Sequence, residues 1–169
     1  MSRAGDIVYK EGTPGLTTRP VAADRSGKDT PIDPNWSGGI TSMAMSPDQK
    51  RMAISLLVNG EQQVWLKQLP TGPLSKLTFG AGDHFRPTWS ADGSIVYYVH
   101  GLDGKFRALY QRSDGTGEPK VLNVGDHSVA DIAASRDGRW LVMRTTGSDT
   151  TTGLLDRKST RLNSSHVKR

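Results

Sequence analysis

Several residue types and patterns are scarce in this chain of 169 residues, and each absence excludes something. There is no cysteine, so disulfides, thiol catalysis and thiolate metal sites are excluded. Aromatic residues make up only 7% of the chain, so any core must rest mainly on aliphatic side chains. No apolar run approaches the roughly 20 residues that a membrane-spanning helix needs. The first residues, M-S-R-A-G-D-I-V-Y-K-E-G, also lack the apolar segment of a secretory signal peptide.

The positive charge is concentrated at the C-terminus. The whole chain carries a formal net charge of +5, but residues 156–169 hold five basic residues against one acidic residue. The preceding 155 residues are therefore nearly neutral, which argues against a nucleic-acid partner. The string D-R-K-S-T-R-L-N-S-S-H, which begins at Asp156, resembles the translation of a sequencing-library adapter. We therefore expect residues 156–169 to be artefactual or disordered and exclude them from the fold.

An internal repeat organises the rest of the chain. The strings M-S-P-D-Q-K-R-M-A, W-S-A-D-G-S-I-V and A-S-R-D-G-R-W-L align with one another. Their aspartates, Asp48, Asp92 and Asp137, are spaced by 44 and 45 residues. A second marker, the glycines at 27, 72 and 117, is spaced by 45 and 45. A period in this range is typical of a β-propeller blade.

Each repeat is predicted to contain four short strands. Asn59-Gly60 is a strong hairpin signal between two apolar stretches, and no segment keeps helical periodicity over three turns. In the second and third repeats the expected strands are 40–45, 51–58, 62–69, 75–79, 95–99, 106–112 and 120–124. The sequence therefore predicts an all-β fold, a partial β-propeller of about 3.5 four-stranded blades. The predicted domain is 1–155, with repeats around 5–46, 47–90, 91–135 and 136–155.

The repeated Asp-Gly turns are predicted to be structural. An aspartate in a tight turn can accept backbone N–H groups, and a following glycine can adopt positive φ. We assign this role to Asp48, Asp92, Gly93, Asp137 and Gly138. A sialidase-type Asp-box needs one residue between Asp and Gly, and a calcium loop needs clustered carboxylates, so both alternatives are disfavoured. Gln49 takes the place of the glycine in the first turn, which is therefore either strained or of another type.

A second recurring motif marks the candidate ligand face. The string G-D-H occurs twice, with its histidines 43 residues apart, in loops expected before the innermost strand of a blade. A metal site would pair His and Asp from adjacent blades, but a plain connecting loop is the favoured interpretation. If a ligand binds, the candidates are Asp83, His84, Arg86, Asp126 and His127.

Motifs for catalysis are missing from the sequence. There is no G-x-S-x-G elbow, no set of protein-kinase motifs, and no Walker A loop, since R-S-G-K at 25–28 lacks the first glycine and the following Ser/Thr. We therefore expect no enzymatic activity, no cofactor and no metal.

Residues 45–99 carry a resemblance to a known family. The strings S-P-D-Q-K-R-M-A-I-S-L, Q-V-W-L-K-Q-L and L-T-F-G-A-G-D-H-F-R-P-T-W-S-A-D-G-S-I-V-Y-Y-V resemble the WD-like propeller repeats of TolB-type proteins. They are also similar to the propellers of prolyl-oligopeptidase-like enzymes and to those attached to bacterial serine/threonine kinases. The resemblance covers roughly residues 5–155, and P-x-W-S-x-D-G at 87–93 is its most specific element.

The resemblance implies a non-catalytic module that binds a protein or a small ligand, in a periplasmic or otherwise extracytoplasmic location. The alternative that it leaves open is a propeller accessory domain of an enzyme, either a kinase sensor or a peptidase gate. The smallest propellers have about four blades, which needs about 176 residues at this period. We therefore expect a fragment of a longer protein, whose partner is another protein or the rest of its own propeller.

Overall fold

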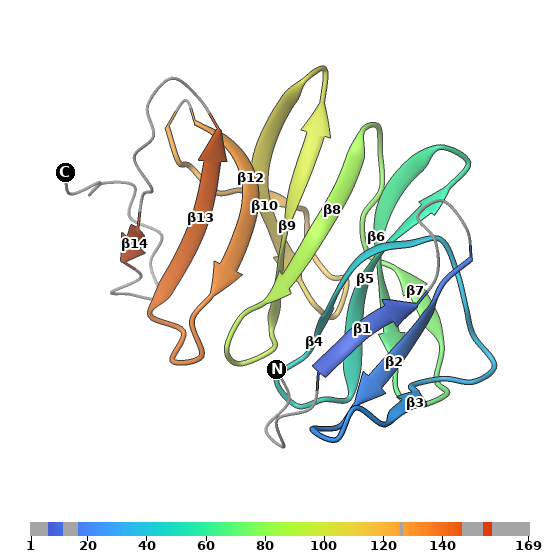
Figure 1. The fold of residues 1–169 in the computed structure, drawn as a ribbon. Coiled ribbons are helices and arrows are strands. Elements are labelled where there is room, and N and C mark those ends of the chain that lie inside the picture. The colour runs from blue at the N-terminus through green and yellow to red at the C-terminus, as the bar shows by residue number, and fades with distance from the viewer. Residues whose placement is uncertain (1–6, 12–16, 126, 147–153, 157–169) are drawn as a thin grey trace.

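The computed structural model describes residues 7–11, 17–125, 127–146 and 154–156, which form 14 strands in four antiparallel sheets (Figure 1). The first sheet comprises β1 (Ile7–Glu11), β2 (Arg19–Ala23) and β3 (Asp29–Pro31). The second sheet comprises β4 (Ile40–Met45), β5 (Arg51–Val58), β6 (Glu61–Gln68) and β7 (Leu74–Lys76). The third comprises β8 (Asp83–Trp89), β9 (Ile95–Leu102), β10 (Lys105–Arg112) and β11 (Lys120–Val121). The fourth comprises β12 (Ser128–Ala134), β13 (Trp140–Thr146) and β14 (Leu154–Asp156).

The predicted fold class is confirmed: the chain is an all-β partial propeller. Each sheet is a meander in which consecutive strands pair, and the sheets fan out side by side (Figure 1). The first two strands of the second sheet have the predicted bounds, whereas the outermost strands are shorter than predicted. Beyond β7 the chain stays attached through a looser contact, because Leu77 N and Thr78 N both donate to Val64 O. No helix occurs among the described residues, and hence none that could cross a membrane.

The core consists of apolar layers between neighbouring sheets. One layer joins the second and third sheets through Ala53, Val64, Leu66, Leu77, Trp89, Val96, Tyr98 and Leu109. Another joins the third and fourth sheets through Tyr97, Val99, Ala108, Leu122, Val129, Ile132, Leu141 and Met143. The third sheet is therefore covered on both faces, which explains why residues 96–99 of β9 are all buried. Each large apolar side chain buried in this way contributes about 1.5–3 kcal/mol.

A buried ion pair ties the segment after the first sheet to the second sheet. Lys67 Nζ lies 2.7 Å from Asp33 Oδ2, and only 5% of each side chain is exposed. The same ammonium group donates to Gly72 O, and Asp33 Oδ1 accepts the N–H of Asn35. The hydrogen bond from Lys67 lowers the pKa of Asp33. Both charges are thus hydrogen-bonded as well as paired, as buried charges must be.

The innermost strands β4, β8 and β12 each contain a β-bulge. The register shifts by one residue between Ile40 and Ser42 in β4, between Phe85 and Thr88 in β8, and between Val129 and Asp131 in β12. The bulges are about 44 residues apart, so they are part of the repeat. A bulge bends its strand and re-aims the side chains next to it.

The boundary of the last sheet lies one residue beyond the predicted domain end at 155. Asp156, which we assigned to the tail, pairs with Trp140 as the last residue of β14. Ladder pairing uses the backbone, so it does not depend on the origin of the side chain. Residues 157–169 lie outside the described residues, as does Asp126.

Candidate functional site

The sheets have two ends, which we call the turn end and the hairpin end. The turn end carries the β4–β5, β8–β9 and β12–β13 turns. The hairpin end carries the tight turns at Asn59-Gly60 and Asp103-Gly104, together with the beginnings of β4, β8 and β12. For the third sheet, the turn end is at the bottom of Figure 1 and the hairpin end is at the top.

At the turn end, the structure places Asp48, Asp92 and Asp137 in equivalent hairpin turns. Each Oδ1 accepts the backbone N–H two residues later, at 3.0, 3.1 and 3.1 Å. Each also accepts the hydroxyl of the serine two residues earlier, at 2.6, 2.6 and 2.5 Å. These hydrogen bonds lower the pKa of all three carboxyl groups, that of Asp92 to about 2. The turns thus hold ionised carboxylates whose Oδ1 atoms are used in closing the turn.

Sequence reasoning missed the role of the serine in these turns. The hydroxyl of Ser46, Ser90 or Ser135 accepts the N–H of the first residue of the next strand, at 2.9 Å in each case. The serine side chain therefore closes the turn from one side while the aspartate closes it from the other. The signal was available, because serine precedes the aspartate by two positions in all three repeats.

Gln49 adopts the same left-handed conformation as the glycines that it replaces. Its φ is 61°, compared with 71° for Gly93 and 69° for Gly138. Of the two alternatives that the sequence left open, the structure shows a strained turn of the same type. A non-glycine residue in this region costs about 1–2 kcal/mol.

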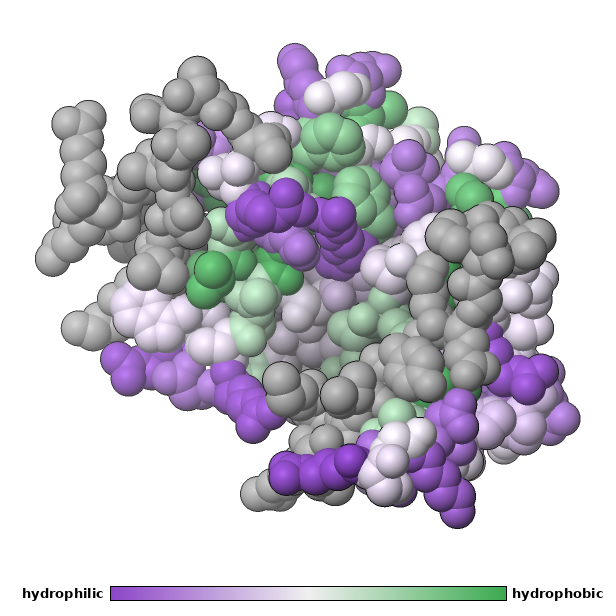
Figure 2. Space-filling view, viewed as in Figure 1, coloured by the Kyte–Doolittle hydropathy of each residue, from purple (hydrophilic) through white to green (hydrophobic). Residues whose placement is uncertain are grey.

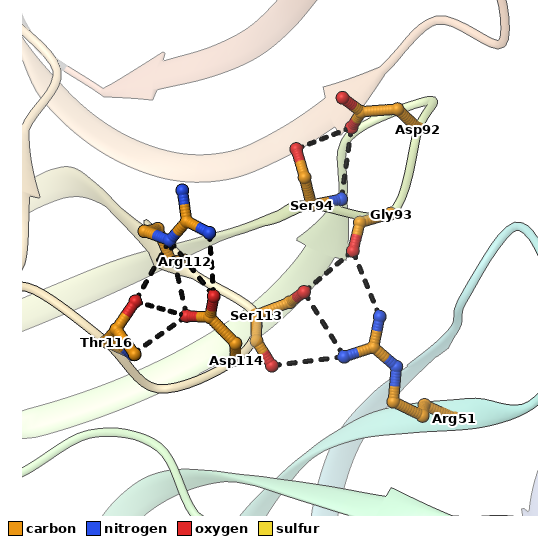
Figure 3. A network of polar contacts seen from close by, with 8 residues as sticks. All are labelled: Arg51, Asp92, Gly93, Ser94, Arg112, Ser113, Asp114 and Thr116. Atoms are coloured by element: carbon orange, nitrogen blue, oxygen red, sulfur yellow. Dashed lines mark hydrogen bonds and ion pairs between the residues drawn. The ribbon is translucent and has the colours of Figure 1, made fainter.

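The turn end also carries a polar contact between the second and third sheets (Figure 3). Arg51 donates from Nη1 to Ser113 O and Oγ at 3.1 and 3.2 Å, and from Nη2 to Gly93 O at 3.2 Å. Its guanidinium lies 4.9 Å from the centre of a Trp89 ring. Every acceptor here belongs to a turn, so Arg51 fastens one blade to the next.

At the hairpin end, Asp83 and His84 are held by neighbouring groups. Asp83 Oδ1 accepts the N–H of Gln62 from the second sheet at 2.9 Å. His84 is only 4% exposed and stacks on His100, with ring centres 4.5 Å apart. Burial, and then the charge of His100, lowers the pKa of His84 to about 4, so the ring is neutral near pH 7. The buried His84 ring therefore presents nothing to a ligand in solution, whereas the Asp83 side chain is only partly buried.

Arg86, unlike His84, has a partly exposed side chain. It has a φ of 52° in the β8 bulge, and its N–H donates to Ser42 Oγ of β4 at 3.0 Å. Its Nη1 donates to Ala130 O of β12 and lies 3.8 Å from Asp131 Oδ2. The exposed fractions of the Arg86 and Asp131 side chains are 41% and 51%. Arg86 thus spans the three innermost strands at the level of their bulges.

The second G-D-H motif takes a different place in the structure. His127 is exposed and precedes β12, and Asp126 lies outside the described residues. His84 pairs with His100, and by strand register its counterparts in the neighbouring sheets are Ile40 and Val129. The two histidines are therefore not equivalent, because His127 lies two residues before Val129 and precedes β12. No three His, Asp or Glu side chains gather as metal ligands in the described part of the chain.

Three further residues at this end were missed by sequence reasoning. Phe85 and Phe106 meet edge to face, with ring centres 6.0 Å apart, and the Arg86 guanidinium carbon lies 6.0 Å from the Phe85 centre. Asp131 supplies the carboxylate beside Arg86. In the space-filling view, a hydrophilic patch crosses the face between β12 and β8, with hydrophobic surface on both sides (Figure 2).

Comparison with known proteins identifies the fold through solved structures. No family model matches the chain, and no curated protein does. TolB from Acinetobacter baumannii is 20% identical with a TM-score of 0.68, and the match covers 89% of this chain and 38% of that one. A putative TolB from Agrobacterium tumefaciens is 16% identical with a TM-score of 0.72, and the match covers 89% of this chain and 57% of that one. The fold is a TolB-like β-propeller. A prolyl endopeptidase also matches this TolB-like propeller, at 20% identity and a TM-score of 0.61, over 94% of this chain and 28% of that one.

The TolB-like fold places Arg86 and Asp131 on strands that line the central channel, because the innermost strand of each propeller blade faces the axis. The chain spans 38% and 57% of the two TolB chains, so it corresponds to part of a propeller of that size. The same fold serves proteins of different activities, so function must be argued from the site.

Proposed function

We propose that this propeller is a non-catalytic binding module, whose ligand or protein partner binds at the hairpin end of the innermost strands. The observation that carries the proposal is the Arg86–Asp131 pair. It combines half-exposed charges with a strained backbone at Arg86, whose counterpart in the preceding repeat is Ser42. Strain of this kind costs about 1–3 kcal/mol and is concentrated at functional sites.

The second candidate function is an accessory propeller of an enzyme, such as a kinase sensor or the gate of a prolyl-oligopeptidase-like peptidase. The likeness to a prolyl endopeptidase propeller favours this alternative. In both cases the propeller itself binds and does not catalyse. The two differ in what contacts the hairpin end: a separate molecule in the first, a domain of the same polypeptide in the second.

Site-specific photo-crosslinking in the cells that make the protein distinguishes these cases. A photoreactive residue is placed at Lys105, beside the hairpin of the third sheet, and in a matched control at Glu118, near the turn end of the same sheet. Both positions are exposed, so neither substitution disturbs the core.

A binding module gives a crosslinked product of higher mass from position 105 and much less from position 118. An accessory domain gives an intramolecular crosslink from position 105, which mass spectrometry of the digested protein locates. Equal crosslinking from both positions contradicts a ligand face at the hairpin end, and no crosslink from position 105 contradicts a protein partner or a neighbouring domain there.

A further inference from the structure

The rim between the third and fourth sheets combines an aromatic surface with an arginine whose hydrogen-bonding capacity is only partly used. Phe85 of β8 and Phe106 of β10 both lie over Gly101 of β9. A Cβ atom at Gly101 would come within 2.8 Å of the Phe106 ring and 3.4 Å of the Phe85 ring. The glycine thus makes room for the two rings on this face. Phe106 remains 39% exposed, so part of this aromatic surface is accessible.

Arg86 lies beside this aromatic surface, with its guanidinium carbon 6.0 Å from the centre of the Phe85 ring. Every polar contact of the Arg86 side chain with the described residues is made by Nη1, which contacts Ala130 O and Asp131 Oδ2. Within the described part of the chain, Nε and Nη2 have no hydrogen-bond partner. An arginine presents its donors in a planar fork that matches a carboxylate. The carbonyl of Ala130 therefore holds the guanidinium in place and leaves other donors for a ligand.

Asp131, the neighbouring carboxylate, does not form a close hydrogen bond with the Arg86 guanidinium. Asp131 Oδ2 lies 3.8 Å from Nη1, and both side chains are about half exposed. Ion pairs of this length and exposure contribute little. Asp131 Oδ1 instead accepts the N–H of Ile132 at 3.0 Å, which orients the carboxylate toward its own backbone.

From this arrangement we infer that Arg86, Phe85 and Phe106 form a binding site for a carboxylate attached to an apolar group, such as the C-terminal residue of a peptide or a free aryl-alkyl acid. Arg86 binds the carboxylate, and the Phe85–Phe106 pair packs against the apolar group. The negative charge of Asp131 repels the same carboxylate and so lowers its affinity. The inference rests on the proposed binding function and specifies the chemistry of its ligand.

The probe is N-acetylphenylalanine, and its neutral control is N-acetylphenylalaninamide. Both are titrated into the whole chain labelled with ¹⁵N, with amide chemical shifts as the readout. We expect the acid to bind about fivefold more tightly than the amide, the magnitude of an accessible charge-assisted hydrogen bond. The largest shifts should fall on the amides of residues 85, 86, 101 and 106. Equal affinities, or no binding by either compound, overturn the inference.

Variants assign the effect to single side chains. Arg86→Gln should abolish the preference for the acid, whereas Arg107→Gln should leave it unchanged, because Arg107 lies next to Phe106 in β10 and points to the opposite face. Phe106→Ser should weaken the acid and the amide alike by about threefold or more. Asp131→Asn should tighten the acid by about threefold and leave the amide unchanged, an effect that a purely structural role would not produce.

If Arg86→Gln lowers the melting temperature enough to prevent titration, the test rests on how Phe106→Ser and Asp131→Asn change binding of the acid and the amide. Tightening of the acid by Asp131→Asn supports the site, and weakening overturns it. A third probe, a pentapeptide ending in phenylalanine with a free carboxyl group, identifies the source of the ligand. Tighter binding of the peptide than of N-acetylphenylalanine indicates a peptide C-terminus, and equal binding indicates a small acid.

Failure of this inference and failure of the proposed function give different results. Crosslinking from position 105 without preference for the carboxylate leaves the binding module in place and removes only its ligand chemistry. Carboxylate binding without a crosslinked partner leaves the small acid as the ligand.

Discussion

The turn end and the hairpin end are built from the same strands, yet only the turn end has the same side-chain network in three repeats. At the turn end, the serine–aspartate network recurs three times with nearly identical distances. At the hairpin end, the residues at corresponding register positions are Ile40, His84 and Val129, of which only one is polar. The serine–aspartate network closes the first hairpin of a blade, so it is needed in each of these repeats. A feature present in only one repeat serves that place in the molecule, so it is the better candidate for function.

Protonation of His84, at the hairpin end, should cause the largest change in the free energy of unfolding. The pKa of His84 is about 4 in the folded protein and 6.5 in its ordinary state, so the unfolded chain binds more protons between these values. The free energy of unfolding therefore falls as the pH is lowered from about 6.5 to about 4, by about 2 kcal/mol after allowance for solvent screening. Urea unfolding at a series of pH values measures this.

The variant His84→Phe should remove most of that dependence, because it removes the titrating ring. Gly82 O, its backbone partner, keeps a hydrogen bond from Gln63 Nε2. His127→Gln is the matched control and should retain the dependence, since His127 is exposed. An unchanged acid dependence in His84→Phe would show that another group is responsible.

Loss of a turn aspartate should have the next largest effect. Asp92→Ala removes hydrogen bonds from Ser90 Oγ, Ser94 N and Ser94 Oγ and should lower the free energy of unfolding by about 1–2 kcal/mol. Asp137→Ala should cost less, because its turn lacks the bond corresponding to Ser94 Oγ. Thermal unfolding of both variants at pH 7 tests the order. The reverse order would mean that the third hydrogen bond adds nothing.

The same turn predicts a further acid effect. The pKa of Asp92 is lowered to about 2, chiefly by the hydroxyl of Ser90. Its contribution to stability is therefore complete above pH 4 and is lost as the pH falls toward 2. Asp92→Ala should reduce the change in the free energy of unfolding between pH 4 and pH 2. This range lies below the pH range in which His84 titrates.

Relief of backbone strain should have the smallest effect, and it should be stabilising. Gln49→Gly places glycine where φ is 61° and should raise the free energy of unfolding by about 0.5–1 kcal/mol, since the relief exceeds the added entropy of the unfolded chain. Gln49→Ala, which cannot relieve the strain, is the control. Equal melting temperatures for the two variants would show that the left-handed conformation costs little here.

The sequence by itself determined the repeat, the hairpins and the structural turns. These depend on residues within six positions of one another, such as Ser90, Asp92 and Ile95, or Asn59 and Gly60 in a tight turn. The bounds of β4 and β5 follow in the same way from short apolar runs between turn signals. Local geometry leaves few alternatives in such segments, so spacing alone is enough to predict them.

Only the tertiary structure decided which of the candidate side chains meet. Arg86 reaches Ala130, which is 44 residues away, and Lys67 pairs with Asp33 across two sheets. His84 is buried while His127 is exposed, although both follow Gly-Asp. The reason is register: His127 lies two residues before Val129, the counterpart of His84, so it precedes β12 and does not enter the layer between the sheets. Register is set by pairing with residues outside the Gly-Asp-His string, so the string alone does not contain that information.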